Sequence, residues 1–197
     1  MNKFLVSQIQ ESLNLKQTIL QDKGFLDALE QACSLSLEVY RSGGKLLIGG
    51  NGGSAADAQH IAGELVSRFY FDRPALPAIA LTTDTSILTA IGNDYGYEDL
   101  FSRQIEGNGK KGDVFLAIST SGNSPNILKG IEIAKKMDIL VIGLTGIAGG
   151  QMADLCDVCL KMPSSSTPRI QECHILMGHL ICSYIEQELF GSAAPLT

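Results

Sequence analysis

Short apolar runs recur along the whole chain and are bounded by glycine, proline or polar residues. Each run is short for a helix and is largely apolar instead of alternating, which is typical of a strand that is covered on both faces of a sheet. The pattern therefore predicts five buried strands, at residues 45–49, 76–81, 114–119, 139–144 and 157–162.

Apolar residues at helical spacing fill the stretches between these runs. Strands that alternate with helices indicate a doubly wound parallel sheet in an α/β fold. We therefore expect one domain over residues 1–197, with ligands bound beyond the carboxyl ends of the strands. The pattern predicts helices at residues 55–69, 84–91, 98–106, 125–137 and 169–190, and a short one after Gly149-Gly150.

Two further amphipathic helices are predicted ahead of the first strand, within residues 4–40, with a break at Asp22-Lys23-Gly24. Neither helix connects two strands, so each has to bury its apolar stripe on the sheet or on another subunit. We expect these helices to serve oligomerisation. The first stripe consists of Phe4, Leu5, Ile9, Leu13, Ile19 and Leu20.

Composition narrows the class of protein. Hydrophobic residues make up 45% of the chain and charged residues 18%, as in a well-buried globular domain. The net charge of −6 argues against a nonspecific nucleic-acid surface, and no apolar run approaches the roughly 20 residues of a membrane span. The odd number of cysteines and the amphipathic N-terminal segment predict a protein of the reduced cytoplasm.

The first predicted strand leads into a glycine-rich turn, Gly49-Gly-Asn-Gly-Gly-Ser54. Backbone N–H groups of such a turn can converge on an anion, and the dipole of the following helix favours negative charge there. Ser54 stands at the position expected of an N-cap. The turn also fits the dinucleotide fingerprint Gly50-x-Gly52-x-x-Ala55, but the acidic partner expected roughly 20 residues later is missing, which disfavours a nucleotide.

A second turn, Ser119-Thr-Ser-Gly-Asn-Ser124, follows the third predicted strand. It offers the hydroxyl groups of Ser119, Thr120, Ser121 and Ser124 together with backbone donors at a helix N-terminus. Many short neutral donors suit a phosphate monoester. An ordinary capped turn that happens to be rich in serine is the alternative, which the density of hydroxyl groups disfavours.

Two helices carry residues that can ligate a metal or transfer protons. His60 and Glu64 are four residues apart, so they share one helix face. Gln171 and His179 lie on the terminal helix, about 12 Å apart along its axis, so they can share a metal only if both side chains reach inward or come from different subunits. A solvated helix face is the alternative interpretation of the His60–Glu64 pair, and the spacing alone does not decide between them.

Four segments, 48–60, 90–94, 117–124 and 169–174, resemble those of the phosphoheptose isomerase family of sugar isomerase (SIS) domain enzymes, and the resemblance extends along essentially the whole chain. It implies interconversion of sedoheptulose 7-phosphate and D-glycero-D-manno-heptose 7-phosphate through an enediol(ate). That reaction is the first step toward ADP-heptose for lipopolysaccharide or capsule. The resemblance also implies a homotetramer with active sites at subunit interfaces and one zinc ion per subunit.

The resemblance assigns roles to individual residues. Substrate contacts are implied for Asn51, Gly52, Gly53 and Ser54, for Asn93 and Asp94, and for Glu64 and Gln171. The phosphate site is implied for Ser119, Thr120, Ser121 and Ser124. Zinc ligands are implied at His60, Glu64, Gln171 and His179, with Glu64 as catalytic base and His179 as catalytic acid.

A second group of SIS-domain proteins is the alternative. Proteins that associate with the bacterial replication initiator share the fold and most of the phosphate turns, but lack the equivalents of Glu64 and His179. Because this chain has both residues, an isomerase is favoured over a non-catalytic binding protein.

Overall fold

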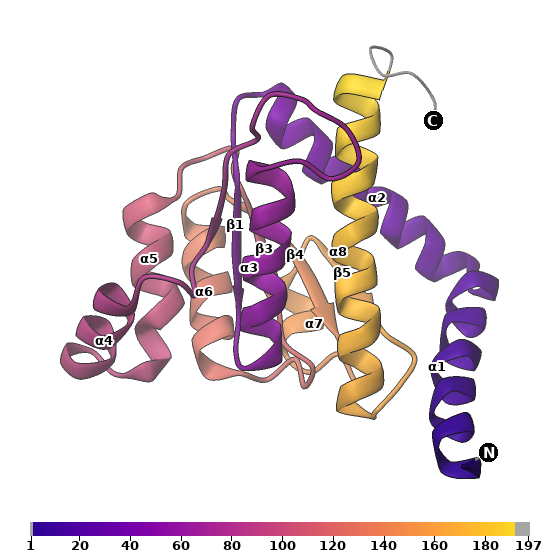
Figure 1. Ribbon diagram of the computed structural model, residues 1–197. Coiled ribbons are helices and arrows are strands. Elements are labelled where there is room, and N and C mark those ends of the chain that lie inside the picture. Colours follow the sequence, from indigo (N-terminus) through magenta and orange to yellow (C-terminus); the bar gives the residue numbers. More distant parts are fainter. Residues whose placement is uncertain (1, 192–197) are drawn as a thin grey trace.

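The computed structural model describes residues 2–191, and at its centre is a five-stranded parallel sheet (Figure 1). The strand order is β2-β1-β3-β4-β5, and each neighbouring pair is parallel. This confirms the predicted doubly wound α/β sheet. The strands are β1 (Leu46–Gly50), β2 (Ala78–Ala80), β3 (Val114–Ile118), β4 (Leu140–Thr145) and β5 (Val158–Lys161).

Helices cover both faces of the sheet, as continuously apolar strands require. On one face, Leu46 and Ile48 pack with residues of α2, α3 and α8 in one apolar cluster. On the other face, Leu47 and Phe115 pack with residues of α5 and α6. The helices are α1 (Lys3–Gln21), α2 (Lys23–Arg41), α3 (Gly53–Val66), α4 (Thr85–Asp94), α5 (Leu100–Asn108), α6 (Pro125–Lys136), α7 (Met152–Leu155) and α8 (Thr167–Phe190), with a 3-10 turn η1 (Tyr97–Asp99) before α5.

The two N-terminal helices differ in how they are buried. Asp22 separates them as predicted: it ends α1, and its carboxylate accepts a hydrogen bond from the N–H of Phe25 at the start of α2. Helix α2 belongs to the chain's own core, whereas α1 projects from the body (Figure 1) and buries only Leu15 and Ile19. The rest of its stripe, Phe4, Leu5, Ile9, Leu13 and Leu20, is exposed.

Some predicted boundaries are wrong: α3 ends at Val66 instead of residue 69, and β2 covers only Ala78–Ala80 of the predicted residues 76–81. Ser54 is not the N-cap of α3, because the helix already begins at Gly53, with Gly52 as its N-cap at a φ of 56° that favours glycine. The side chain of Ser54 is instead buried in the first helical turn. Asn93 and Asp94 end α4, since the helix predicted at residues 84–91 continues for about one more turn than its apolar pattern indicates.

Candidate active site

The site lies where the winding of the sheet reverses. Strand β1 pairs with β2 on one side and with β3 on the other, so the connections leaving β1 and β3 diverge to opposite faces. Ligands of open α/β sheets bind at such a switch point, beyond the carboxyl ends of the strands. Both glycine- and serine-rich turns leave the sheet there, after β1 and after β3.

Asn51, in the turn after β1, is fixed by two side chains that the sequence patterns did not indicate. Its amide and that of Asn126 exchange two hydrogen bonds of 2.9 Å, and the hydroxyl group of Tyr97 donates to Asn51 Oδ1 at 2.8 Å. Asn126 is buried in the first turn of α6. Asn51, Gly52 and Tyr97 line a cavity of about 310 Å³ that also includes Thr82 and Thr89.

Three of the four hydroxyl groups predicted for the second turn lie close together. Ser119 Oγ lies 2.9 Å from Ser124 Oγ and 3.5 Å from Ser121 Oγ. Ser124 is the N-cap of α6, but its side chain makes no capping hydrogen bond to the helix. The hydroxyl group is directed toward Ser119 and not toward the helix. Thr120 and Ser121 also line a cavity of about 290 Å³ against the segment that precedes α8.

Helices α3 and α8 lie side by side and approach closely because Gly178 has no side chain (Figure 1). A Cβ atom built on Gly178 would lie 2.5 Å from Cδ1 of Ile61 on α3. His60 precedes Ile61, and His179 follows Gly178. The close approach therefore brings the two histidines to the same edge of the helix pair.

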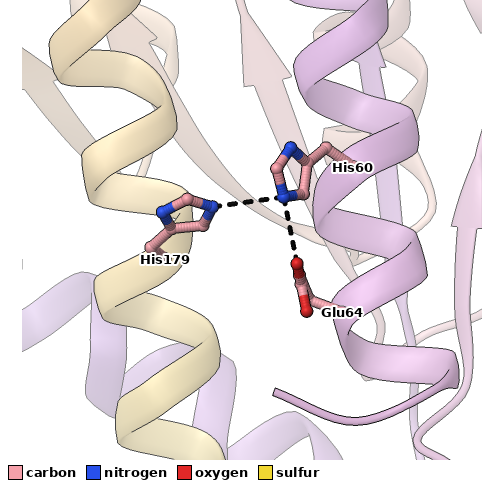
Figure 2. A group of neighbouring side chains, drawn as sticks. All are labelled: His60, Glu64 and His179. Atoms are coloured by element: carbon pink, nitrogen blue, oxygen red, sulfur yellow. Dashed lines mark hydrogen bonds and ion pairs between the residues drawn. The ribbon is translucent and has the colours of Figure 1, made fainter. Parts of the chain in front are cut away.

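His60, Glu64 and His179 gather in one cluster, with His60 and Glu64 on α3 facing His179 on α8 (Figure 2). His60 Nε2 lies 3.0 Å from Glu64 Oε1 and 3.3 Å from His179 Nε2. One ligand atom from each of the three residues lies within 4.8 Å of the others. All three side chains come from one chain, so this part of the site does not require a second subunit.

The cluster fits a divalent metal ion. Bonds of 2.0–2.2 Å at tetrahedral angles put ligand atoms about 3.3–3.6 Å apart, close to the 3.0 and 3.3 Å found here. Two imidazoles and one carboxylate are a ligand set of catalytic zinc sites, which keep a further position open. Glu64 and His179 are partly buried and His60 is exposed, so the cluster is open to solvent.

The other predicted residues lie apart from this cluster. The amide of Gln171 packs against Gly53 at the start of α3, where a Cβ atom would lie 2.5 Å from Gln171 Nε2. Within one chain Gln171 therefore lies beside the first turn, not in the cluster. Asn93 and Asp94 are exposed and bonded to each other, with Asn93 Nδ2 2.8 Å from Asp94 Oδ1.

Phe69 is a neighbour of the cluster whose contact with His179 was not predicted from the sequence. Its ring centroid lies 5.5 Å from that of His179, so it covers one side of the imidazole. Apolar periodicity predicted Phe69 as the last residue of a helix at residues 55–69, but α3 ends at Val66 and Phe69 follows it in a segment of irregular structure.

His174, one turn after Gln171, is a buried polar residue of α8. The ring is fully buried, and neither nitrogen has a hydrogen-bond partner of good geometry among residues 2–191. Burial lowers the pKa of His174 to about 4, and the nearby backbone of Thr145 offsets only part of this effect. The ring is therefore neutral in the folded protein at neutral pH.

His174 is expected to make the fold sensitive to acid. In the unfolded chain the imidazole of His174 becomes protonated below its ordinary pKa of 6.5, whereas in the folded protein the buried ring stays neutral down to about pH 4. The free energy of unfolding is therefore not reduced by this residue above pH 6.5, and it falls by about 3 kcal/mol as the pH is lowered toward 4. Denaturant unfolding of wild type and His174→Phe across this range checks the prediction: the free energy of unfolding of wild type minus that of the variant should decrease by about 3 kcal/mol as the pH falls.

Comparison with known proteins identifies the class. Residues 10–146 match the SIS domain family. A phosphoheptose isomerase of Aneurinibacillus thermoaerophilus is 62% identical over 190 residues, which cover 96% of each chain. Phosphoheptose isomerase 2 of Campylobacter jejuni is 58% identical over 191 residues, covering 97% of this chain and 95% of the relative.

Solved structures agree. The phosphoheptose isomerase of Neisseria gonorrhoeae superposes with a TM-score of 0.88 at 44% identity, over 94% of this chain and 98% of that chain. That of Francisella tularensis gives 0.89 at 37% identity, over 95% and 100%. The chain therefore belongs to the SIS domain family and, within it, to the phosphoheptose isomerases.

Proposed function

We propose that the protein interconverts sedoheptulose 7-phosphate and D-glycero-D-manno-heptose 7-phosphate, the first step of ADP-heptose biosynthesis. The observation that carries the proposal is the cluster of His60, Glu64 and His179, on a chain of this family. A binding protein of the replication-initiator-associating type is disfavoured, because Glu64 and His179 have no role in such a protein.

Catalysis of this reaction requires movement of one proton between C1 and C2. We assign this transfer to the Glu64 carboxylate, which carries the C1 proton of the ketose to C2 of the aldose. His179 takes and returns the proton of the sugar oxygens in the enediol(ate). Zinc, when bound, polarises the carbonyl group and stabilises the enediolate charge. His60, Glu64 and His179 would hold it.

The assignment of a fourth zinc ligand to Gln171 stays a prediction. Its amide lies beside Gly53 in the same chain, which supports a substrate contact together with Asn51, Gly52 and Ser54. Asn93 and Asp94 are assigned to the substrate as well. Because both residues are exposed, they can contact a ligand that enters from solvent or one that is bound by a neighbouring subunit.

The apolar stripe of α1 supports assembly. Phe4, Leu5, Ile9, Leu13 and Leu20 expose between 49% and 72% of their surface, more than a helix of a stable monomer usually leaves uncovered. A homotetramer with repeated isologous contacts would cover this stripe. Among residues 2–191, no helix is both long and apolar enough to cross a membrane.

Turnover tests the proposed function. Purified protein is incubated with sedoheptulose 7-phosphate, before and after treatment with a chelator, and the anomeric protons of the aldose product are followed by NMR. We expect an aldose heptose phosphate to appear, activity to fall on chelation and zinc to restore it. Unphosphorylated sedoheptulose is the control and should react far more slowly. No product in the presence of added zinc would contradict the proposal.

The serine-rich turn should determine substrate affinity. Replacing Ser121 and Ser124 together with alanine removes two of the converging hydroxyl groups, so KM should rise at least tenfold while kcat changes little. Ser183→Ala, which removes a hydroxyl group bonded only within α8, is the control and should keep the wild-type KM. An unchanged KM in the double variant would place the phosphate elsewhere.

A further inference from the structure

A buried ion pair lies outside the cluster and has no part in the proposed chemistry. Arg73 Nε and Glu186 Oε1 are 3.1 Å apart, and their side chains are 1% and 0% exposed. Burying two charges is unfavourable unless further hydrogen bonds satisfy both groups. The further hydrogen bonds of Arg73 and Glu186 therefore indicate what the pair does in the fold.

Glu186 holds the segment that follows α3. Besides Arg73, its carboxylate accepts the backbone N–H of Phe69 at 2.9 Å and that of Tyr70 at 2.7 Å. Both oxygens are thus occupied, by donors from one short stretch of chain. Glu186 itself is on α8, about two turns after His179 and so on nearly the same face.

Arg73 holds the carboxyl end of α3. Its Nη2 donates to the backbone oxygen of Glu64 at 2.8 Å, and its Nη1 donates to that of Leu65 at 2.7 Å. The same nitrogen also reaches the backbone oxygens of Ser67 and Pro74. The last carbonyl groups of a helix lack partners within it and favour a positive charge, so the guanidinium group acts as the C-terminal cap of α3.

These contacts join the two halves of the cluster. The backbone that carries Glu64 is bonded to Arg73, Arg73 is bonded to Glu186, and Glu186 is on the helix that carries His179. Glu186 also fixes the backbone of Phe69, whose ring covers His179. One ion pair thus sets both the distance between α3 and α8 at this level and the packing against His179.

We propose that Arg73 and Glu186 are positioning residues, which hold Glu64 and His179 in register for catalysis. They do not touch the substrate in this proposal. It rests on the proposed function, since it gives Glu64 and His179 the roles stated above. Loss of the pair should lower kcat more than it changes KM, because the binding turns lie at the other end of α3.

The chain contains a matched control, the pair Lys45–Asp113. The Asp113 carboxylate is also fully buried and accepts two backbone N–H groups, from Lys45 at 3.0 Å and Lys110 at 2.9 Å, together with the Lys45 ammonium group at 2.6 Å. Both residues precede strands, so they lie at the amino edge of the sheet, away from the site. Asp113→Asn therefore removes the same kind of interaction without affecting the cluster.

The experiment compares Glu186→Gln with Asp113→Asn in the full-length protein. The chain has only three histidines, so ring signals of ¹³C-histidine-labelled protein report on His60 and His179, with buried His174 as an internal reference. In Glu186→Gln we expect the His60 and His179 signals to shift and kcat to fall at least tenfold. The melting temperatures of Asp113→Asn and Glu186→Gln should fall by similar amounts. In Asp113→Asn, however, the histidine signals should be unchanged and kcat should stay within twofold of wild type.

Arg73→Lys is the second variant, for the case that Glu186→Gln does not fold. Lysine keeps a positive charge beside Glu186 but lacks the two guanidinium nitrogens that donate to the α3 carbonyl groups. Arg73→Lys should therefore show the same shifts of the histidine signals and the same loss of kcat as Glu186→Gln. Unchanged His60 and His179 signals with wild-type kcat in a folded variant would overturn the proposal. The histidine signals do not require turnover, so absence of activity in wild type would instead count against the proposed function.

Discussion

Replacing Glu64 with glutamine should lower kcat for sedoheptulose 7-phosphate by about a hundredfold or more, the range of lost general-base catalysis. Glutamine has nearly the same shape as glutamate but cannot accept the carbon proton. Glu64 Oε1 lies 3.0 Å from His60 Nε2, so the amide can occupy the same place. KM should change little, because the serine-rich turn proposed to bind the phosphate is unaltered. Steady-state kinetics with the product followed by NMR measure both constants.

The control for this variant is Glu188→Gln, an exposed glutamate on α8, which should retain wild-type kcat. Zinc content is measured in all three proteins, because Glu64 is also a proposed zinc ligand. A low kcat in zinc-loaded Glu64→Gln supports the role as a base, whereas wild-type kcat in this variant would exclude it.

Placing two negative charges on the exposed stripe of α1 should abolish tetramer formation. Ile9 and Leu13 are 72% and 49% exposed in the single chain, and we expect both to be buried between subunits. Burying each such side chain contributes about 1.5–3 kcal/mol, which Ile9→Glu with Leu13→Glu would replace by the unfavourable burial of charge. Light scattering should show a smaller species than wild type.

The matched control adds the same charge at two exposed polar positions of α1. Gln10→Glu with Gln17→Glu should keep the wild-type mass. A wild-type protein that is monomeric at working concentration, or an Ile9→Glu/Leu13→Glu variant that still forms a tetramer, would contradict the assignment of this stripe to assembly. Activity of the dissociated variant then shows whether the site depends on a second subunit.

The sheet could be predicted from the sequence because each buried strand reads as an apolar run, and because the helix between two runs fixes parallel pairing. Helix ends were less predictable. The start of α3 depends on the positive φ of Gly52, and residue types alone did not show whether the helix begins there or at Ser54. The exposed stripe of α1 and the buried stripe of α2 also look alike in sequence, since only packing distinguishes them.

Only part of the site could be predicted, because much of it depends on contacts between distant segments. His60 and Glu64 share a helix face by spacing alone, but their meeting with His179 depends on the contact between Gly178 and Ile61, which joins distant segments. Asn126, Tyr97 and the Arg73–Glu186 pair act through such long-range contacts as well. No local pattern marks them, because each is an ordinary residue until the fold brings its partner near.

The reaction in D2O tests the central claim most directly. Zinc-loaded wild-type protein is mixed with sedoheptulose 7-phosphate, and NMR follows both the appearance of the aldose and the hydrogen at its C2. Transfer by Glu64 through an enediol(ate) exposes the proton to exchange with solvent, so we predict D-glycero-D-manno-heptose 7-phosphate that carries deuterium at C2. Absence of the aldose would contradict the function, and an aldose formed without any deuterium at C2 would contradict an enediol(ate) intermediate whose proton exchanges with solvent.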